Sequence, residues 1–180
     1  MTYGDSAGPN LCLARLGTRL KLQARLAFRR TAPLSKTLFT IGYEGLDPER
    51  LRTALRDAGV AVLADVRAVA NSRKRGFSKG ALRAGLEEAG LGYAHLRALG
   101  TPKAGREAAR AHDAALMRRI YCEEVLDTAD GGLALDALAE MAGTQAVCLL
   151  CFERDPERCH RRVLAERLGA RGFAVVDLFG

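Results

Sequence analysis

From residue 37 onward, short and strongly apolar segments alternate with longer segments whose apolar positions recur at helical spacing. The short segments are rich in β-branched residues, which is typical of buried strands, and they span residues 37–42, 60–66, 92–96, 145–152 and 173–178. The longer segments predict helices over residues 48–59, 79–90, 112–128, 132–143 and 156–172. This alternation predicts an α/β fold in three layers, a mainly parallel five-stranded sheet flanked by helices.

Polar and reactive side chains gather where the predicted strands end. Ligands of open parallel sheets bind outside the carboxyl ends of the strands, so these residues are the first candidates for a site. At the strand ends and the start of the last helix lie Gly42, Tyr43, Glu44, Asp65, Arg67, Cys151, Glu153, Cys159, His160 and Arg161. The residues expected to line one pocket are Asp65, Arg67, Cys151, Glu153 and His160.

The tetrapeptide DPER occurs twice, at residues 47–50 and 155–158. Its Asp can cap free N–H groups, its Pro suits the first helical position and its Glu suits the positive end of the helix dipole, so DPER favours a helix start. An ordinary amphipathic segment follows the first copy. The second copy is flanked by reactive residues that helix initiation does not need, namely Cys151, Glu153, Cys159, His160 and Arg161.

Two cysteines and a histidine dominate the chemistry of this second copy. A cysteine in the first helical turn beside arginines is expected to favour the thiolate, which applies to Cys159. Adjacent helical residues point about 100° apart, so His160 is better placed to pair with Cys151 than with Cys159. We predict Cys151 and His160 as the reactive couple. The full set of candidate catalytic residues is Asp65, Cys151, Glu153, Cys159 and His160.

The same donors also raise the question of a metal. Cys148 lies three residues before Cys151 on the predicted strand, faces the opposite side and belongs to the core. The remaining donors, with Glu153 as a fourth, lack the two short ligand pairs of a structural zinc site. We therefore expect no metal and no cofactor. Glu153 itself needs partners at the end of a buried strand, and the candidates are Arg67, Arg161 and the amides after Asp155.

Several candidates also have an ordinary structural interpretation. Asp65 and Arg67, two residues apart on a strand, can form a structural ion pair. Residues 72–79, SRKRGFSK, can be a solvated basic loop in which Ser78 caps the next helix. His95 can be a hydrogen-bonded histidine at a strand end. No surrounding residues indicate chemistry for His112, Cys12 or Cys122.

Composition narrows the class of protein. The chain has 180 residues, 48% of them apolar, which is enough for one well-formed core. Its apolar runs are shorter than the roughly 18 residues of a membrane span, and its first residues lack the order of a secretory signal. Five cysteines without a framework spacing favour reduced thiols. We expect a cytoplasmic protein with no membrane partner, and the sequence leaves its oligomeric state open.

The net charge of +7 is unevenly distributed. Residues 1–36 contain seven Lys or Arg and one acidic residue, whereas residues 37–180 contain 21 basic and 20 acidic residues. We expect residues 1–36 to form a flexible basic extension whose removal leaves stability intact, and residues 37–180 to form one domain. The near-neutral balance of that domain argues against nucleic acid as its main partner.

Four ordered motifs, FTIGYEG, ADVRAVANSRKRGFS, YAHLRALGTPK and LLCFERDPERCHRRVLAE, resemble the DUF488 family of small bacterial and archaeal proteins. The resemblance covers residues 38–180. It implies a compact α/β domain but no particular substrate. The recurrent family residues fall on Gly42, Asp65, Arg67, Ser72, Arg73, Phe77, Ser78, His95, Gly100, Cys151, Glu153, Cys159, His160 and Arg161.

Three functional hypotheses follow. In the first, the pocket binds or processes a small anionic ligand, phosphate- or nucleotide-like. Its expected ligand-binding residues are Gly42, Tyr43, Arg67, Ser72, Arg73, Phe77, Ser78, His95 and Arg161. In the second, the loop 72–79 and the basic extension contact nucleic acid phosphates, with Phe77 as a stacking surface. In the third, the cysteines and His160 bind a metal or sense redox state.

Overall fold

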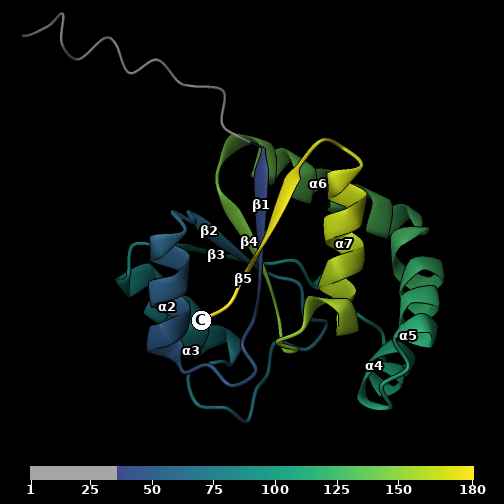
Figure 1. Ribbon diagram of the computed structural model, residues 1–180, viewed down its shortest axis with the longest axis horizontal. Coiled ribbons are helices and arrows are strands. Elements are labelled where there is room, and N and C mark those ends of the chain that lie inside the picture. The colour runs from purple at the N-terminus through teal and green to yellow at the C-terminus, as the bar shows by residue number, and fades with distance from the viewer. Residues whose placement is uncertain (1–35) are drawn as a thin grey trace, which may run out of the picture. The chain divides into compact units, whose positions relative to one another are not determined.

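Five parallel strands form one sheet in the computed structural model, which describes residues 36–180 (Figure 1). The strands are β1 (Thr37–Gly42), β2 (Val62–Asp65), β3 (Gly92–His95), β4 (Val147–Cys151) and β5 (Ala174–Leu178). Their order across the sheet is β3-β2-β4-β1-β5, and every neighbouring pair is parallel. Each strand lies within or coincides with a segment that the apolar pattern predicts.

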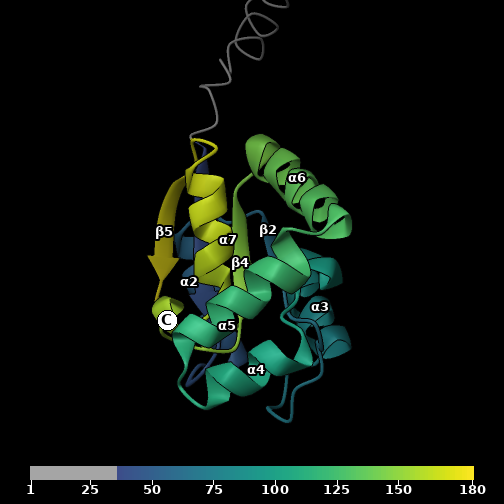
Figure 2. The same cartoon turned by 90° about the vertical axis from the view of Figure 1, so that its right-hand side faces the viewer.

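Helices cover both faces of the sheet, so the predicted three-layer α/β fold is confirmed (Figures 1 and 2). One face carries α2 (Pro48–Asp57) and α3 (Lys79–Glu88). The other face carries α4 (Lys103–Arg110), α5 (Ala114–Tyr121), α6 (Ala129–Thr144) and α7 (His160–Gly169). Short helical turns of other types span Arg97–Leu99, Cys122–Leu126 and Pro156–Arg158.

Each face of the sheet has its own hydrophobic core. Successive strand residues point to opposite faces, and all five residues of β4 are buried because both faces are covered. Leu149 accordingly packs with the core under α5, α6 and α7, whereas Leu150 packs with the core under α2 and α3. Cys148 belongs to the second core and is fully buried, so its prediction as a core residue is confirmed. Burial raises the pKa of its thiol.

Three helical segments depart from the pattern. The helix α4 is not among the predicted elements, because KAGREAAR buries only Gly105 and Ala108, and such small residues do not form a stripe of large apolar side chains. The predicted helix 112–128 begins at Ala114 and ends in a single π-type turn, Cys122–Leu126. The predicted helix 156–172 is divided in two at Cys159, with consequences for the candidate site.

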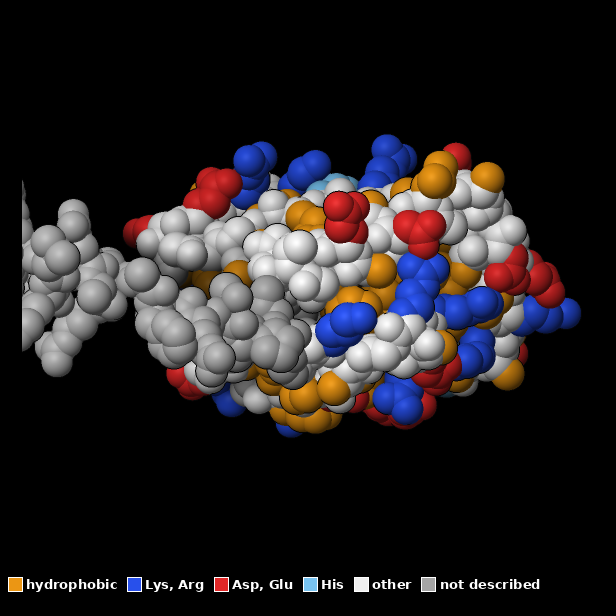
Figure 3. All heavy atoms as spheres, turned by 90° about the horizontal axis from the view of Figure 1, so that it is seen from above, with side chains coloured by type: hydrophobic (Ala, Val, Ile, Leu, Met, Phe, Trp, Pro, Cys, Tyr) orange, Lys and Arg blue, Asp and Glu red, His pale blue; other side chains and the backbone are white. Residues whose placement is uncertain are grey.

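The charge pattern on the described surface is mixed. Acidic and basic side chains are interspersed on the face shown in Figure 3, in keeping with the near-neutral balance of residues 37–180. Within residues 36–180, no helix is both long enough and apolar enough to cross a membrane. The expected basic extension, apart from Lys36, and Cys12 lie outside the described residues.

Candidate functional site

The carboxyl ends of β1, β2 and β4 meet at one edge of the sheet. Gly42 lies opposite Cys151, and Asp65 lies opposite Leu150, so the residues that follow these strands are neighbours. A pocket of about 610 Å³ opens here. Its lining residues are Tyr43, Glu44, Arg67, Ala68, Val69, Arg73, Thr101, Arg106, Ala109, Arg110, His112, Met117, Cys151, Phe152, Glu153, Asp155, Arg158, Cys159 and His160.

The second DPER segment does not begin a continuous helix. The Asp155 carboxylate accepts a hydrogen bond from the Glu157 N–H and caps a single 3₁₀ turn, Pro156–Arg158. Cys159 then has an extended backbone, with φ −131° and ψ 141°, and α7 begins at His160. Cys159 is therefore the residue before the helix rather than part of its first turn.

This break brings two sulfur atoms close to one nitrogen of the His160 ring. The Nδ1 atom of His160 lies 3.6 Å from the Cys151 sulfur and 3.9 Å from the Cys159 sulfur. The predicted proximity of Cys151 and His160 is confirmed. The prediction that Cys159 diverges from His160 is wrong, because the 100° offset applies only between residues that are both helical.

The opposite ring nitrogen fixes the orientation of His160. Its Nε2 atom lies 2.9 Å from the Val66 carbonyl oxygen, and a carbonyl can only accept, so Nε2 is assigned the proton. In the neutral ring the Nδ1 lone pair then faces the two sulfurs. The Tyr121 ring packs against the imidazole with centroids 5.0 Å apart, and His160 is only 5% exposed. The imidazole is thus held rigidly with an acceptor atom directed at Cys151 and Cys159.

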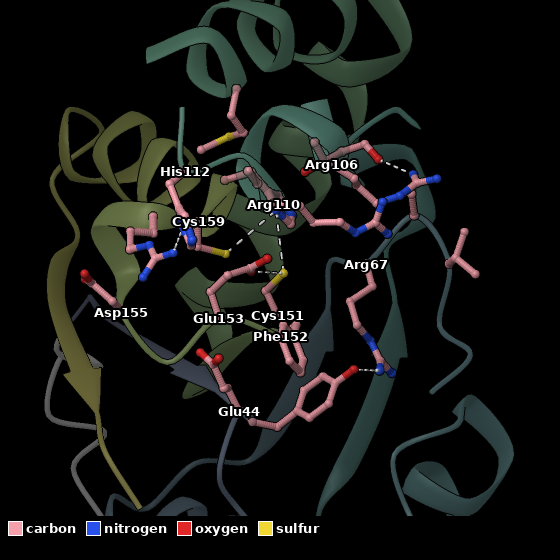
Figure 4. A pocket seen from close by; sticks show the side chains of 18 of the residues that line it. Glu44, Arg67, Arg106, Arg110, His112, Cys151, Phe152, Glu153, Asp155 and Cys159 are labelled. Atoms are coloured by element: carbon pink, nitrogen blue, oxygen red, sulfur yellow. Dashed lines mark hydrogen bonds between the residues drawn. The ribbon is translucent and has the colours of Figure 1, made fainter. Parts of the chain in front are cut away.

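Glu153 completes the cluster. Its Oε2 atom accepts a hydrogen bond of 3.2 Å from the Cys151 thiol, and Figure 4 shows Cys151, Glu153 and Cys159 pointing toward one another. Burial alone would raise the pKa of Glu153, but hydrogen bonds from Cys159, its own backbone N–H and Cys151 outweigh burial and lower the pKa. Thiols, not the expected arginines, are therefore the side-chain donors to this carboxylate.

Burial also changes the expectation for Cys159. Its side chain is 2% exposed, and desolvation, reinforced by Cys151, raises the pKa of its thiol well above the ordinary value. The helix dipole and nearby arginines were expected to favour a Cys159 thiolate. That prediction is wrong, because burial without a contacting cation favours the protonated thiol. A buried sulfur gains little from charges that do not contact it.

Gly42 and Arg161 position the Glu153 loop instead of binding a ligand. A Cβ atom at Gly42 would lie 1.8 Å from the Glu153 carbonyl oxygen, so only glycine permits this close approach. Arg161 is 1% exposed and donates to the backbone carbonyls of Glu153 and Arg154 and to the Thr40 hydroxyl. Neither Gly42 nor Arg161 lines the pocket, so the structure does not bring them together with the other expected ligand-binding residues.

Asp65 and Arg67 form a buried ion pair. The Nε and Nη2 atoms of Arg67 donate to the Asp65 carboxylate over 2.8 and 2.6 Å. The Tyr93 hydroxyl donates to the same carboxylate, and Arg67 Nη1 donates to the Tyr43 hydroxyl and the Phe77 carbonyl. Burial alone would lower the pKa of Arg67, but Asp65 and Tyr43 together raise it.

The ion pair therefore has a structural interpretation. Asp65 is fully buried and does not line the pocket, so the prediction that it lines the pocket with the other four residues is wrong. Arg67 does line the pocket, but four of its five N–H groups are already used. Arg67 is consequently a wall of the pocket that holds Tyr43 in place.

Four more expected ligand-binding residues lie away from the pocket. The Ser78 hydroxyl donates to the Ser72 carbonyl, so both residues stabilise their own loop. His95 Nε2 bonds the Arg67 carbonyl over 2.9 Å. Phe77 is fully buried and stacks on Tyr43 with centroids 4.5 Å apart, so it is not an exposed stacking surface. Of the expected binding set, Tyr43, Arg67 and Arg73 line the pocket.

Sequence reasoning missed the opposite wall of the pocket. Arg106 and Arg110 come from α4, and His112 and Arg158 lie beside each other at the rim. His112 adopts a positive φ of 62°, which is uncommon outside glycine. The four-residue spacing of Arg106 and Arg110 was the available signal, because it places both on one side of a helix. Because no helix was predicted over this segment, the spacing alone did not place Arg106 and Arg110 on a common side.

These features define a class: an all-parallel α/β protein with an arginine-lined pocket over two buried cysteines and a buried histidine, with a half-buried glutamate beside them. A match to the family "Domain of unknown function DUF488" covers residues 47–168, most of the chain. The chain belongs to this family, and the resemblance seen in its motifs is confirmed. No curated protein and no solved structure matched the chain.

Proposed function

We propose that the protein binds or processes a small anionic ligand, phosphate- or nucleotide-like, in the pocket above the cysteine–histidine cluster. The supporting observation is the charge of the rim. Arg73, Arg106, Arg110 and Arg158 line the pocket, and none of them has an acidic ion-pair partner among residues 36–180. Arginine recognises phosphate and carboxylate groups through paired N–H donors.

Several arginines elsewhere on the described surface are already paired with acids. Arg83, Arg118 and Arg171 each contact a carboxylate of a neighbouring Glu or Asp. The acids of the pocket have other partners, because Glu44 accepts the Arg154 N–H and Asp155 accepts the Glu157 N–H. The positive charge of the rim is therefore left without an acidic ion-pair partner, and an anionic ligand would supply one.

The pocket also suits an organic anion. Its volume of about 610 Å³ lies within the range of small-molecule sites. Apolar side chains line it beside the arginines, and Val69 and Phe152 are 57% and 45% exposed. Phe152 packs edge-on against Tyr43 with centroids 5.3 Å apart. A phosphorylated molecule with a flat or apolar part would contact both kinds of surface.

The nucleic-acid alternative has less support. Its expected stacking residue, Phe77, is buried in a core, and the expected loop residues Ser72 and Ser78 bond each other. A bound polymer would also require a basic path across the surface, whereas acidic and basic side chains are interspersed on the face shown in Figure 3. Binding of the intact protein to random single-stranded DNA with a steep salt dependence would favour this alternative.

Calorimetric titration with inorganic phosphate, mononucleotides and sugar phosphates tests the proposal. We expect at least one of these anions to bind the full chain. The double substitution Arg106→Ala and Arg110→Ala should weaken that affinity by about tenfold or more, since a charged hydrogen bond contributes about 1.5–3 kcal/mol. Arg119→Ala is the matched control, because Arg119 is an exposed arginine of α5 outside the pocket.

Two outcomes would overturn the proposal. One is that none of the anions binds the wild-type chain. The other is that Arg119→Ala weakens binding as much as the double substitution, which would place the anion outside the pocket.

A further inference from the structure

The donor atoms of Cys151, Cys159 and His160 lie within 4.8 Å of one another, and all three residues are buried. We propose that these three residues bind one divalent transition-metal ion of the zinc class, with a coordination position open to the pocket. This inference goes beyond ligand binding by the arginine rim. It rests on the geometry of the cluster alone.

The separations match the edges of a coordination tetrahedron. Zinc–sulfur bonds of about 2.3 Å and zinc–nitrogen bonds of about 2.0 Å at tetrahedral angles place sulfur and nitrogen about 3.6 Å apart. The two Sγ–Nδ1 distances in the cluster are 3.6 and 3.9 Å. The two sulfurs lie within 4.8 Å of each other, and tetrahedral zinc brings such a pair to about 3.8 Å, so a metal ion fits between the three atoms once the cysteine side chains close on it.

The histidine is oriented as a ligand. Metal-binding imidazoles usually donate their second N–H to a carbonyl or carboxylate, which fixes the ring and its lone pair. His160 has this arrangement, since Nε2 bonds the Val66 carbonyl and Nδ1 faces the sulfurs. Val66 directly follows β2, so the sheet itself holds the ring in position.

The composition of the cluster favours a metal over an acid–base couple. A thiol–imidazole couple needs one sulfur, whereas here two sulfurs converge on one nitrogen lone pair. Besides the His160 nitrogen, the Cys151 sulfur contacts the Glu153 carboxylate oxygen over 3.2 Å, and an oxygen donor at this position also suits a zinc-class ion. A cation placed among two sulfurs, an imidazole and a carboxylate satisfies all four donors, and soft sulfur ligands select zinc-class ions.

Binding is balanced in protons and charge. The divalent ion displaces one proton from Cys151 and one from Cys159, both protons pass to solvent, and the resulting two-thiolate, one-imidazole centre is neutral. Three protein ligands leave a fourth position for Glu153, water or a ligand atom, as in catalytic zinc sites. Since Cys151 and Cys159 line the pocket floor, an anionic oxygen held by the arginine rim could reach that position. Cys151 is then a ligand and not a nucleophile.

Metal analysis of the reduced full chain tests the site. The protein is treated with a chelator, incubated with zinc alone, separated from free zinc by gel filtration and analysed for zinc. We expect about one zinc ion per chain, and at least a tenfold loss of zinc affinity in Cys159→Ser. Cys122→Ser is the matched control, because Cys122 is a free cysteine outside the cluster, and it should retain zinc.

Cobalt spectroscopy of the wild-type chain keeps the test decisive if Cys159→Ser does not fold. Bound Co²⁺ should show thiolate charge-transfer absorption and the intense visible bands of tetrahedral coordination. Absence of retained zinc together with a cobalt spectrum lacking thiolate bands would overturn the inference, as would full zinc retention by folded Cys159→Ser. The variant with Arg106→Ala and Arg110→Ala should still bind one zinc ion, so failure of the anion proposal is measured separately.

Discussion

The two DPER segments have the same four residues and different structures. In the first, the Asp47 carboxylate accepts the Arg50 N–H, and Pro48 begins the ten-residue helix α2. In the second, Asp155 caps a turn of only three residues before the extended backbone of Cys159 interrupts the helix. The capping signal operates in both copies. What differs is the length of helix that follows.

Contacts outside the tetrapeptide explain the difference. The residue after the first copy is Leu51, which is buried in the core as part of α2. The residue after the second copy is Cys159, whose extended conformation directs its sulfur to the cluster, and Arg161 ties the preceding loop to α7 through two carbonyls. Local sequence therefore starts a helical turn, and tertiary contacts decide whether it continues.

The largest expected effect in this comparison comes from Arg161→Leu. The substitution leaves the partly buried carbonyl groups of Glu153 and Arg154 without their charged donor, which should lower the free energy of unfolding by about 3 kcal/mol. Denaturant unfolding of the reduced, metal-free chain measures it. Arg52→Ala in the first helix is the control and should cost about 0.5 kcal/mol or less, because its ion pair with Glu49 is at the surface. Equal losses would show that Arg161 does not hold the second segment.

A smaller effect is expected from Glu153→Gln. An amide N–H₂ group replaces an acceptor oxygen beside the sulfurs, so unfolding should become easier by about 1–2 kcal/mol and thiol labelling of Cys151 should change. The measurement uses the metal-free chain. Glu157→Gln, at the position that matches Glu49, removes only a surface ion pair with Arg162 and should be nearly silent in both assays. If Glu153→Gln changes stability and thiol labelling as little as Glu157→Gln does, Glu153 does not act on the cysteines and the site hypothesis fails.

The smallest effects concern the two caps. Asp47→Ala removes the cap of a ten-residue helix and should cost about 1 kcal/mol of stability. Asp155→Ala removes the cap of a three-residue turn and should cost about 0.5 kcal/mol, but it should accelerate labelling of Cys159 by loosening the segment before it. Unfolding and thiol-labelling measurements on both variants check this. Faster labelling of Cys159 in Asp47→Ala would contradict the expectation that only the second DPER segment affects the accessibility of this cysteine.

The comparison also shows how much of the fold the sequence contains. All five strands were predictable, since buried parallel strands are continuous apolar runs such as VCLLC in β4. The helix α4 was not, because its buried positions are Gly105 and Ala108, and small residues at helical spacing are a weaker signal than large apolar side chains. The interruption at Cys159 was also not predictable, because CHRR is compatible with a continuous helix until the partners of Cys159 are known.

For the candidate site, the sequence predicted which residues come together better than it predicted what each residue does. Cys151, Glu153, Cys159 and His160 come together as the strand-end rule predicts. Arg161 instead uses its donors within the protein, and Asp65 is enclosed by Arg67 and Tyr93. Whether a charged group is free or already paired depends on long-range packing, which one sequence does not reveal.

An anomalous-diffraction crystal structure of the full chain, grown with zinc and inorganic phosphate, tests the central claim most directly. The claim is that the second DPER segment builds a metal-binding floor under an anion-binding rim. We predict a zinc peak bonded to Cys151, Cys159 and His160, with phosphate between this peak and Arg106 or Arg110. A structure in which zinc and phosphate both lie outside this pocket would contradict the account.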